Sequence, residues 1–291
     1  MKKINFWEYK KEYKYLKTKG LINKIDNSLD SGEIFYGKKL NEFEKKFLKF
    51  NNSKYGIAVK TGTDALIVAL IASGIKPGDE VITVSLTAIP TVSAIVSVGA
   101  KPVFVDVNDK CLINISKIEK KISKKTKAII PVHLYGNTCE MKSIISISKK
   151  YKLKIIEDSA QAHGSTFKNK NPGYFSDVAT FSFYPTKNLG AVGEGGAIVT
   201  NSLSIFNKTK RMRTWSHKKH NFYEISFNYR MSEFSAISLI EKLKYLNKDV
   251  SLRNKIARYY KKKLILKSYS KYNKKIKKHS YHIFAITVAS S

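Results

Sequence analysis

Cysteine is almost absent from this sequence, which limits how the fold can be cross-linked. The two cysteines, Cys111 and Cys139, are too few for a disulfide framework and lack the paired spacing of a zinc site. With 291 residues, the chain can bury a large hydrophobic core without such links. We therefore expect no structural metal, and so few cysteines are typical of a protein of the reducing cytoplasm.

Long apolar runs are missing as well. Residues 1–11 carry charges throughout and lack the apolar core of a signal peptide. The stretch from Ala65 to Ala72 falls well short of the ~20 apolar residues that a membrane-spanning helix needs. We expect a soluble protein with no membrane partner.

Arginine is scarce although the chain is strongly basic. Five of the 54 basic residues are arginine, so lysine supplies almost all of the positive charge behind the formal net charge of +32. Proteins that read phosphates and base edges favour the planar fork of arginine, and the lysines here are spread over nearly every polar segment. We interpret the charge as a solvated surface that mildly attracts anionic substrates, and we expect no nucleic-acid partner.

Common phosphate-binding and hydrolytic motifs are absent too. The sequence has no Gly-x-Gly-x-x-Gly after a strand pattern, no Gly-x-x-x-x-Gly-Lys-Ser/Thr loop and no Gly-x-Ser-x-Gly elbow. The sequence therefore lacks the motifs expected for dinucleotide binding, nucleotide hydrolysis and α/β-hydrolase chemistry.

The sequence does contain an alternation of strand and helix patterns from about Asp64 to Thr200. Most of the strand patterns are continuous apolar runs, which are typical of buried parallel strands. This predicts an α/β fold, a three-layer αβα domain with a mostly parallel sheet. The expected strands are 80–85, 101–107, 128–134, 153–158, 178–183, 197–200 and, near the end of the chain, 281–288. The expected helices are 65–70, capped by Thr63, then 92–98, 115–122, 141–151 and a long helix beyond Ser232.

Ligands of open α/β sheets bind beyond the carboxyl ends of strands, and three such junctions carry polar residues. The first is the turn of Thr61, Gly62 and Thr63, which opens a helix. Free backbone amides at a helix N-terminus, a close approach at Gly62 and two threonine hydroxyls predict a phosphate site. The alternative is a capped helix without a ligand.

The second junction ends the apolar strand 153–158 with two carboxylates, Glu157 and Asp158. A carboxylate there must be paired or solvated, because burying an isolated charge is costly. The alternative is that Asp158 caps a following helix. Nearby His163 is, by itself, typical of a hydrogen-bonded structural histidine.

The third junction places Lys187 on a loop after the strand 178–183, followed by Gly190 and Gly193. A lysine held partly out of water has a lowered pKa, which frees its amine for carbonyl chemistry. The alternative is an ordinary surface charge, since lysine is so common in this chain.

Taken in order, these segments resemble the sugar aminotransferases of the DegT/DnrJ/EryC1/StrS family, which belongs to the aspartate-aminotransferase fold class. The likeness runs through most of the chain. It is carried by the motifs Gly62 to Leu66, Gly78 to Ile82, Gly99 to Val107, Pro131 to Gly136, Glu157 to Gly164, Phe181 to Gly190 and Asn228 to Glu233.

The resemblance implies that the chain binds pyridoxal 5'-phosphate (PLP). Lys187 would hold PLP as a Schiff base and then shuttle the proton between the substrate carbon and the cofactor. Asp158 would pair with the pyridine nitrogen and keep it protonated, so that the ring can accept electrons. Gln161 would contact the ring face or its 3-hydroxyl group.

The resemblance also implies a phosphate site, a partner subunit and a substrate class. Ser182 and the turn of Gly62 and Thr63 would hold the phosphate, which Asn228 would reach from the other subunit of a homodimer. An amino acid such as glutamate would donate the amino group to a keto sugar attached to a nucleotide diphosphate. The form of the lysine loop, residues 183–190, is similar to that of members that act at the third sugar carbon, and such enzymes serve polysaccharide biosynthesis.

Three departures from the family pattern bear on this expectation. Ala88 stands where many relatives place an aromatic ring over the cofactor, and Ser226 stands where glycine commonly occurs. Relatives also continue well past the last expected strand. We therefore expect a large cofactor-binding domain over residues 1–245 and an incomplete small α+β domain over residues 246–291.

Two other functions are alternatives to the aminotransferase. A sugar dehydratase of the same fold is disfavoured, because those relatives replace the Schiff-base lysine by histidine and this chain has Lys187. A truncated, inactive homologue that acts as a dimerising or binding protein is the alternative from another class, and it rests on the short C-terminal region.

Overall fold

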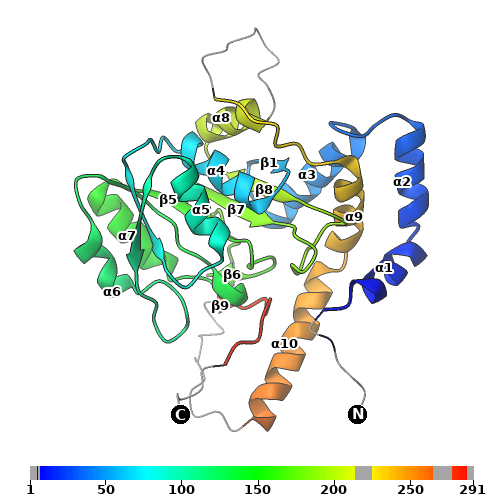
Figure 1. Ribbon diagram of the computed structural model, residues 1–291. Helices are drawn as coiled ribbons and strands as arrows, with labels where there is room; N and C mark the ends of the chain where they lie inside the picture. The colour runs from blue at the N-terminus through cyan, green and yellow to red at the C-terminus, as the bar shows by residue number, and fades with distance from the viewer. Residues whose placement is uncertain (1–4, 6, 214–224, 265–276, 287–291) are drawn as a thin grey trace.

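A sheet of seven strands runs through the centre of the protein, and helices cover both of its faces (Figure 1). The computed structural model describes residue 5 and residues 7–213, 225–264 and 277–286. The strands are β1 (Tyr55–Val59), β2 (Glu80–Val84), β3 (Lys101–Val105), β4 (Thr126–Ile129), β5 (Lys154–Asp158), β6 (Thr166–Phe167), β7 (Val178–Ser182), β8 (Gly196–Thr200) and β9 (Lys277–Lys278). The α-helices are α1 (Tyr9–Thr18), α2 (Leu21–Asp30), α3 (Lys38–Asn51), α4 (Gly62–Ala72), α5 (Ile89–Ser97), α6 (Ile115–Ile118), α7 (Met141–Tyr151), α8 (Leu203–Arg213), α9 (Glu233–Leu243) and α10 (Leu246–Lys263). The 3-10 helices are η1 (Glu119–Lys121) and η2 (Leu134–Gly136).

The strand order of the large sheet is β1-β8-β7-β5-β4-β2-β3. Strand β8 runs antiparallel to both of its neighbours, and the pairs from β7 to β3 are parallel. The predicted α/β class with a mostly parallel sheet is therefore confirmed. A separate two-stranded sheet pairs β6 with β9 and so joins the large sheet domain to the C-terminal region.

Alternate residues of the central strands point to opposite faces and build two hydrophobic cores. Val178 of β7 belongs to a core with α4, α5 and α8, whereas Ala179 and Phe181 of the same strand pack with α3 and α9. This follows from the two-residue period of side chains along a strand. Burial on both faces explains why these strands are continuous apolar runs in the sequence.

The N-terminus of α4 differs from the expected helix start. Thr61 is the cap, because its backbone is extended (φ −140°, ψ 166°) and its Oγ1 accepts a hydrogen bond from the Asp64 amide at 3.0 Å. Gly62 and Thr63 already lie in the first turn. The prediction that Thr63 caps the helix was therefore wrong, because Gly62 adopts the helical conformation in spite of its low helix propensity.

Two other expected elements also need correction, and one strand was missed. The long helix beyond Ser232 is two helices, α9 and α10, which are separated at residues 244–245. Residues 281–286 form no strand, and residues 287–288 of that expected strand lie outside the described residues. Strand β1 was not expected at all, because its pattern is short and Gly56 interrupts it.

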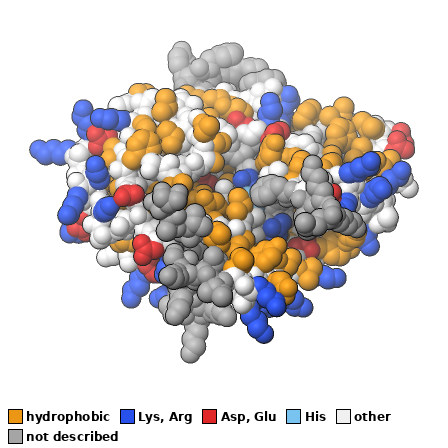
Figure 2. All heavy atoms as spheres, turned by 60° about the horizontal axis from the view of Figure 1, so that its bottom comes forward, with side chains coloured by type: hydrophobic (Ala, Val, Ile, Leu, Met, Phe, Trp, Pro, Cys, Tyr) orange, Lys and Arg blue, Asp and Glu red, His pale blue; other side chains and the backbone are white. Residues whose placement is uncertain are grey.

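On the face drawn in Figure 2, the positive charge is dispersed. Figure 2 shows lysine and arginine side chains around the edge of one face, with hydrophobic side chains among them. On the described part of this face, the basic side chains do not gather into a single patch. Among the described helices, none is both long and apolar enough to cross a membrane.

Glu233 ties the N-terminal helices to the sheet domain. Its buried carboxylate accepts hydrogen bonds from the backbone amides of Gly37 (2.7 Å), Lys39 (2.8 Å) and Leu40 (3.0 Å). These amides lie at the start of α3, where a helix leaves its N–H groups without partners of its own. Glu233 therefore acts as a cap for α3 that comes from the start of α9.

We expect Glu233→Ala to lower the free energy of unfolding by about 3 kcal/mol, because three amides lose a buried acceptor. Urea denaturation followed by circular dichroism measures the change. Glu119→Ala is the matched control, because Glu119 forms an exposed ion pair with Lys150 (3.0 Å) that should contribute little. Equal effects of the two substitutions would contradict the capping role of Glu233.

Candidate active site

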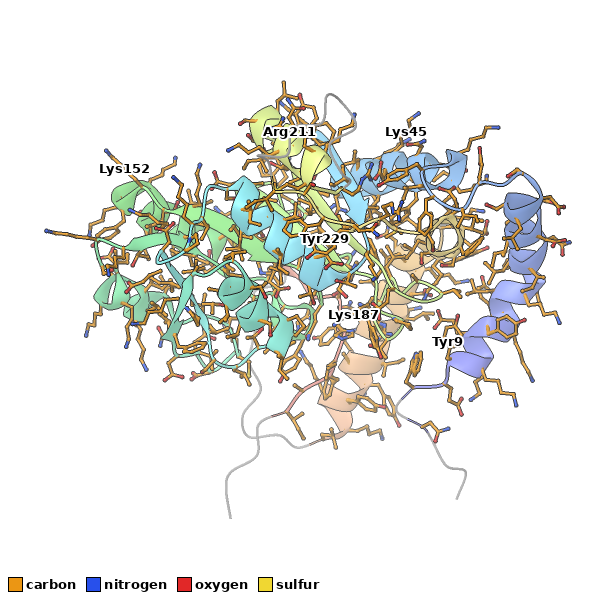
Figure 3. All side chains as sticks on the ribbon, turned by 45° about the horizontal axis from the view of Figure 1, so that its top comes forward. Tyr9, Lys45, Lys152, Lys187, Arg211 and Tyr229 are labelled. Atoms are coloured by element: carbon orange, nitrogen blue, oxygen red, sulfur yellow. The ribbon has the colours of Figure 1, made fainter. Side chains whose placement is uncertain are left out.

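The three polar junctions meet at the carboxyl edge of the sheet. Strands β5 and β7 are parallel neighbours, so Asp158 and Ser182 leave the sheet at the same edge. The start of α4 joins them there, because a Cβ atom at Gly62 would lie only 2.6 Å from the Cβ of Ser182. Lys187 follows β7 on the next loop and lies near the middle of the molecule (Figure 3).

Backbone hydrogen bonds close the loop that carries Lys187. The Phe183 amide donates to the Gly195 carbonyl (2.7 Å), and the Ala191 amide donates to the Phe183 carbonyl (2.7 Å). Within the loop, the Lys187 amide donates to the Tyr184 carbonyl (2.8 Å). These bonds turn the chain back on itself and hold the base of the Lys187 side chain in one place.

Burial is the main influence on the Lys187 amine. It lowers the pKa of Lys187 from the usual value of 10.5, and the nearby Asp158 carboxylate opposes part of that shift. A lower pKa increases the fraction of neutral amine, which is the form that attacks a carbonyl group. Lys187 is half-buried, as expected of a lysine held partly out of water, and its role in carbonyl chemistry stays a prediction.

Asp158 is held at the end of β5 with 5% of its surface exposed. Its Oδ2 accepts a hydrogen bond from the Thr91 hydroxyl (2.7 Å), and its Oδ1 accepts one from the Ala160 amide (3.1 Å). The residues that follow form turns and no helix, so the interpretation of Asp158 as a helix cap was wrong. Two hydrogen bonds fix an acidic group close to Lys187.

Thr91 is a site residue that the sequence reading missed. It lies in the first turns of α5, and its hydroxyl is 2.8 Å from that of Thr87. The signal was present in the sequence, because two threonines four residues apart follow the carboxyl end of a strand. Ala88, where many relatives place an aromatic ring, lies between them as the N-cap residue of α5.

His163 is buried against the aromatic rings of Phe181 and Phe183, with ring centroids 5.5 and 5.6 Å away. Within the described part of the chain, neither ring nitrogen forms a hydrogen bond of full geometry, although the Ser182 backbone acts on the ring as a weak partner, so the expected hydrogen-bonded structural histidine stays a prediction. Burial lowers the pKa of His163 well below its usual value, and the positive charge of Lys187 adds to this shift. The ring is therefore neutral and close enough to Lys187 to feel its charge.

The turn before α4 has the geometry of an anion site. The Thr61 hydroxyl is occupied by the Asp64 amide, while Gly62 and Thr63 begin the helix. A Cβ atom at Gly62 would also lie 3.1 Å from the Ser182 Oγ, so glycine is needed for this hydroxyl to come so near the helix N-terminus. An anion would find backbone amides and the Ser182 hydroxyl together.

Gln161 and Asn228 lie at the edges of the site. The side-chain oxygen of Gln161 accepts a hydrogen bond from the Tyr135 amide (2.7 Å), so its amide nitrogen is the atom that it can offer to a ligand. Asn228 is exposed, and the carbonyl of the next residue, Tyr229, accepts a hydrogen bond from the Lys60 amide (2.9 Å). The Asn228 segment therefore runs beside the start of α4.

These groups fit a phosphorylated aromatic aldehyde such as PLP. The site offers the Lys187 amine, the Asp158 carboxylate and the anion site at the start of α4. Two buried atoms, Ser159 Oγ next to Asp158 and Asn188 Oδ1 next to Lys187, have no hydrogen-bond partner among the described residues. Buried polar atoms nearly always have one, so these two atoms are polar groups beside the site that the described residues leave unsatisfied. The same described residues contain no cluster of His, Cys, Asp or Glu that could hold a metal ion.

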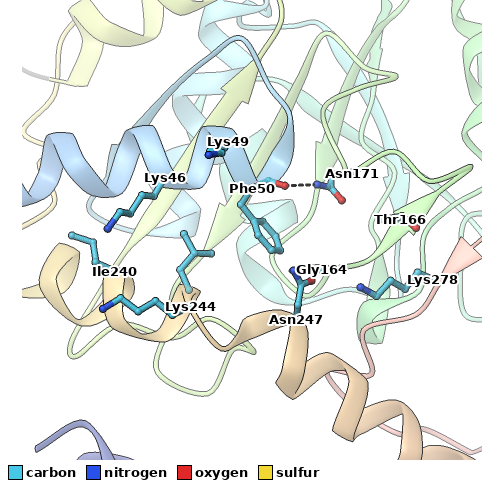
Figure 4. A pocket seen from close by; sticks show the side chains of 11 residues that line it. Lys46, Lys49, Phe50, Gly164, Thr166, Asn171, Ile240, Lys244, Asn247 and Lys278 are labelled. Carbon is cyan, nitrogen blue, oxygen red and sulfur yellow. Dashed lines mark hydrogen bonds between the residues drawn. The ribbon is translucent and has the colours of Figure 1, made fainter. Parts of the chain in front are cut away.

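A separate cleft of about 550 Å³ opens beside α3, α9 and α10 (Figure 4). Four of its lining residues are lysines, namely Lys46, Lys49, Lys244 and Lys278. Two of these are already paired with carboxylates, Lys46 with Glu42 and Lys244 with Glu241. None of the predicted site residues lines this cleft, so it is distinct from the site at the carboxyl edge of the sheet.

Comparison with known sequences gives one family. The model of the DegT/DnrJ/EryC1/StrS aminotransferase family matches residues 17–291. The dTDP-3-amino-3,6-dideoxy-alpha-D-galactopyranose transaminase of Aneurinibacillus thermoaerophilus is 42% identical over 239 residues, which cover 81% of this chain and 66% of that protein. The chain spans about two thirds of the length of the curated relatives it matches.

Solved structures agree with the fold. The crystal structure of S. venezuelae DesV covers 98% of this chain with a TM-score of 0.92 and 32% identity, and this chain covers 77% of DesV. The structure of NtdA from Bacillus subtilis with the bound cofactor PMP, the amino form of PLP, has a TM-score of 0.83 and 32% identity. That match covers 92% of this chain and 62% of NtdA.

Proposed function

The chain belongs to the DegT/DnrJ/EryC1/StrS aminotransferase family, a family of PLP-dependent nucleotide-sugar transaminases, and we propose that it moves an amino group from an amino acid to the keto group of a nucleotide-diphosphate sugar. The observation that carries this proposal is the desolvated Lys187 amine beside the buried Asp158 carboxylate. When bound, PLP supplies an electron-accepting ring that stabilises negative charge on the substrate carbon.

The residues of this chain have separate tasks in that reaction. Lys187 would hold the cofactor through its amine and would carry a proton to and from the substrate carbon. Asp158, fixed by its two hydrogen bonds, keeps a proton on the ring nitrogen. Ser182 and the Gly62 turn would bind the phosphate, and Gln161 would donate from its side-chain amide to the ring hydroxyl.

We propose glutamate as the amino donor and the third sugar carbon as the position that receives the amino group. The form of the lysine loop supports this position, as does the name of the transaminase from Aneurinibacillus thermoaerophilus. The test is a panel of nucleotide sugars with a keto group at the third or the fourth carbon, incubated with PLP and glutamate and read by product mass. Products from the fourth-carbon sugars alone would contradict the proposed position, and no product from any sugar would contradict the function.

We also propose that the active unit is a homodimer in which Asn228 reaches the partner's phosphate site. The exposed side chain of Asn228 supports this. We expect Asn228→Ala to weaken PLP binding about tenfold, because a hydrogen bond to a charged group contributes roughly 1.5 kcal/mol. Fluorescence titration with PLP measures the affinity, and sedimentation velocity measures the assembly. Asn23→Ala, on the exposed side of α2, is the control, and a monomer with undiminished PLP affinity would overturn the proposal.

A further inference from the structure

Residues 279–283, here called the strap, cross the edge of the candidate site. Ser280 of the strap is fully buried, and its amide donates to the Gly136 carbonyl (2.9 Å). The Ser165 hydroxyl lies 2.8 Å from that of Ser280, and the Ile283 amide donates to the Tyr135 carbonyl (3.4 Å). The strap is therefore docked on the loop whose Tyr135 amide also binds Gln161.

Helix α10 holds the strap from its other side. The Asn254 side chain donates to the carbonyl of His279 (2.8 Å), and the Arg253 guanidinium donates to the carbonyl of Tyr281 (3.1 Å). The strap thus has anchors on both sides, although it forms no helix or strand itself. Segments anchored in this way keep a defined position without regular structure of their own.

The strap borders Lys187. Asn188, the next residue along the chain, donates from its side chain to the carbonyl of Ser280 (3.1 Å). Burial lowers the pKa of His282, on the strap, to about 3, and the positive charges of Lys187 and Arg253 contribute to that shift. Charges act strongly on each other only over short distances in a partly dry site. The hydrogen bond from Asn188 to Ser280 therefore places the strap directly beside the loop that carries Lys187.

We propose that the strap shields the Lys187 amine from water and thereby sets how readily this amine reacts. The inference rests on the proposed role of Lys187 and assigns a positioning role to a segment far from it in the sequence. Water stabilises an ammonium group more than a neutral amine, so excluding water favours the neutral, nucleophilic form. Burial is indeed the largest influence on the pKa of Lys187.

Gly136 offers a direct way to lift the strap. Its φ is +90°, and a Cβ atom there would lie 2.4 Å from the Oγ of Ser280, 2.9 Å from the amide nitrogen of Tyr281 and 3.0 Å from that of His282. Two of these three atoms are backbone, so Gly136→Ala must displace the strap. Gly74 is the matched control, because its φ is +89° and an added Cβ would meet no atom within 4 Å. Gly74→Ala therefore brings the same backbone strain without the collision.

The test measures the pKa of Lys187 in cofactor-free protein. Reductive methylation with formaldehyde and cyanoborohydride is run across a pH series, and mass spectrometry quantifies the peptide that contains Lys187. We expect a midpoint below 10.5 for the wild type and the Gly74→Ala control. We expect Gly136→Ala to raise the midpoint by about one unit, which lowers the neutral fraction about tenfold at pH 8. The midpoint reports protonation, whereas the plateau rate at high pH reports access, so the two effects of an open site are separated.

An unchanged midpoint in Gly136→Ala would overturn the proposal, and faster deuterium exchange of the Ser280 and Ile283 amides verifies that the strap has moved. Should Gly136→Ala fail to fold, Asn254→Leu removes the anchor on the His279 carbonyl instead. Asn254→Leu should also raise the midpoint, by a smaller amount. An unchanged midpoint in this variant would equally overturn the proposal. Neither PLP nor substrate takes part, so failure of this test is distinct from failure of the proposed transaminase function.

Discussion

Lys187→Ala is expected to abolish amino transfer and the visible absorbance of bound PLP, while the fold stays intact. The substitution removes the amine that attaches the cofactor and carries the proton. Loss of a group with both tasks should lower turnover on the order of 10⁴-fold or more. Lys187 itself belongs to neither of the two hydrophobic cores, so the free energy of unfolding should change little. Absorbance after dialysis against PLP, a turnover assay and circular dichroism measure the three properties.

Two further variants isolate the chemistry of this amine. Lys187→Arg keeps a positive charge, but the guanidinium stays protonated and cannot attach the cofactor, so it should be as inactive as the alanine variant. Lys45→Ala removes an exposed lysine of α3 and should behave like the wild type (Figure 3). Activity retained in Lys187→Ala would contradict the mechanism.

Asp158→Asn is expected to lower turnover about 100-fold or more, because a fixed charge that acts on the reacting group is lost. The asparagine can still accept the hydrogen bond of Thr91, and the phosphate site is unchanged, so PLP should still bind. Turnover and PLP affinity are measured separately. Turnover should fall in this variant, whereas the PLP affinity should stay close to that of the wild type.

Asp106→Asn is the matched control for this substitution. Asp106 is exposed, pairs with Lys117 at 2.9 Å and follows β3, the edge strand of the sheet, three strands away from β5. It should leave turnover unchanged. Comparable turnover in Asp158→Asn and the wild type would show that Asp158 has only a structural task.

The sequence predicted the class of the fold and the junctions that carry the site. Strands of a parallel sheet are buried on both faces, so they appear in the sequence as continuous apolar runs. The run that ends at Asp158 is one example, and such a run can be recognised without knowledge of its neighbours. The same reasoning placed Lys187 after a buried strand, and the structure adds the burial that lowers the pKa of its amine. The polar residues at the carboxyl ends of these strands could therefore be identified from the sequence.

Contacts between distant segments could not be predicted in this way. The hydrogen bond from Thr91 to Asp158 joins residues 67 positions apart, and that from Asn188 to Ser280 joins residues 92 positions apart. Neither leaves a periodic pattern in the sequence. The strap also lacks regular structure, so an apolar stretch was mistaken for a strand where anchors on α10 and on the Gly136 loop decide the conformation.

The most direct test of the central claim is to locate the lysine that carries PLP. PLP-loaded protein is reduced with borohydride and digested, and mass spectrometry maps every lysine that has gained a pyridoxyl phosphate group. The predicted result is a single modified lysine, Lys187, whose modification is lost when glutamate is added before the reduction, because the cofactor then leaves the lysine in its amino form. Modification spread over the many exposed lysines of this chain, with Lys187 no more reactive than the rest, would contradict the account.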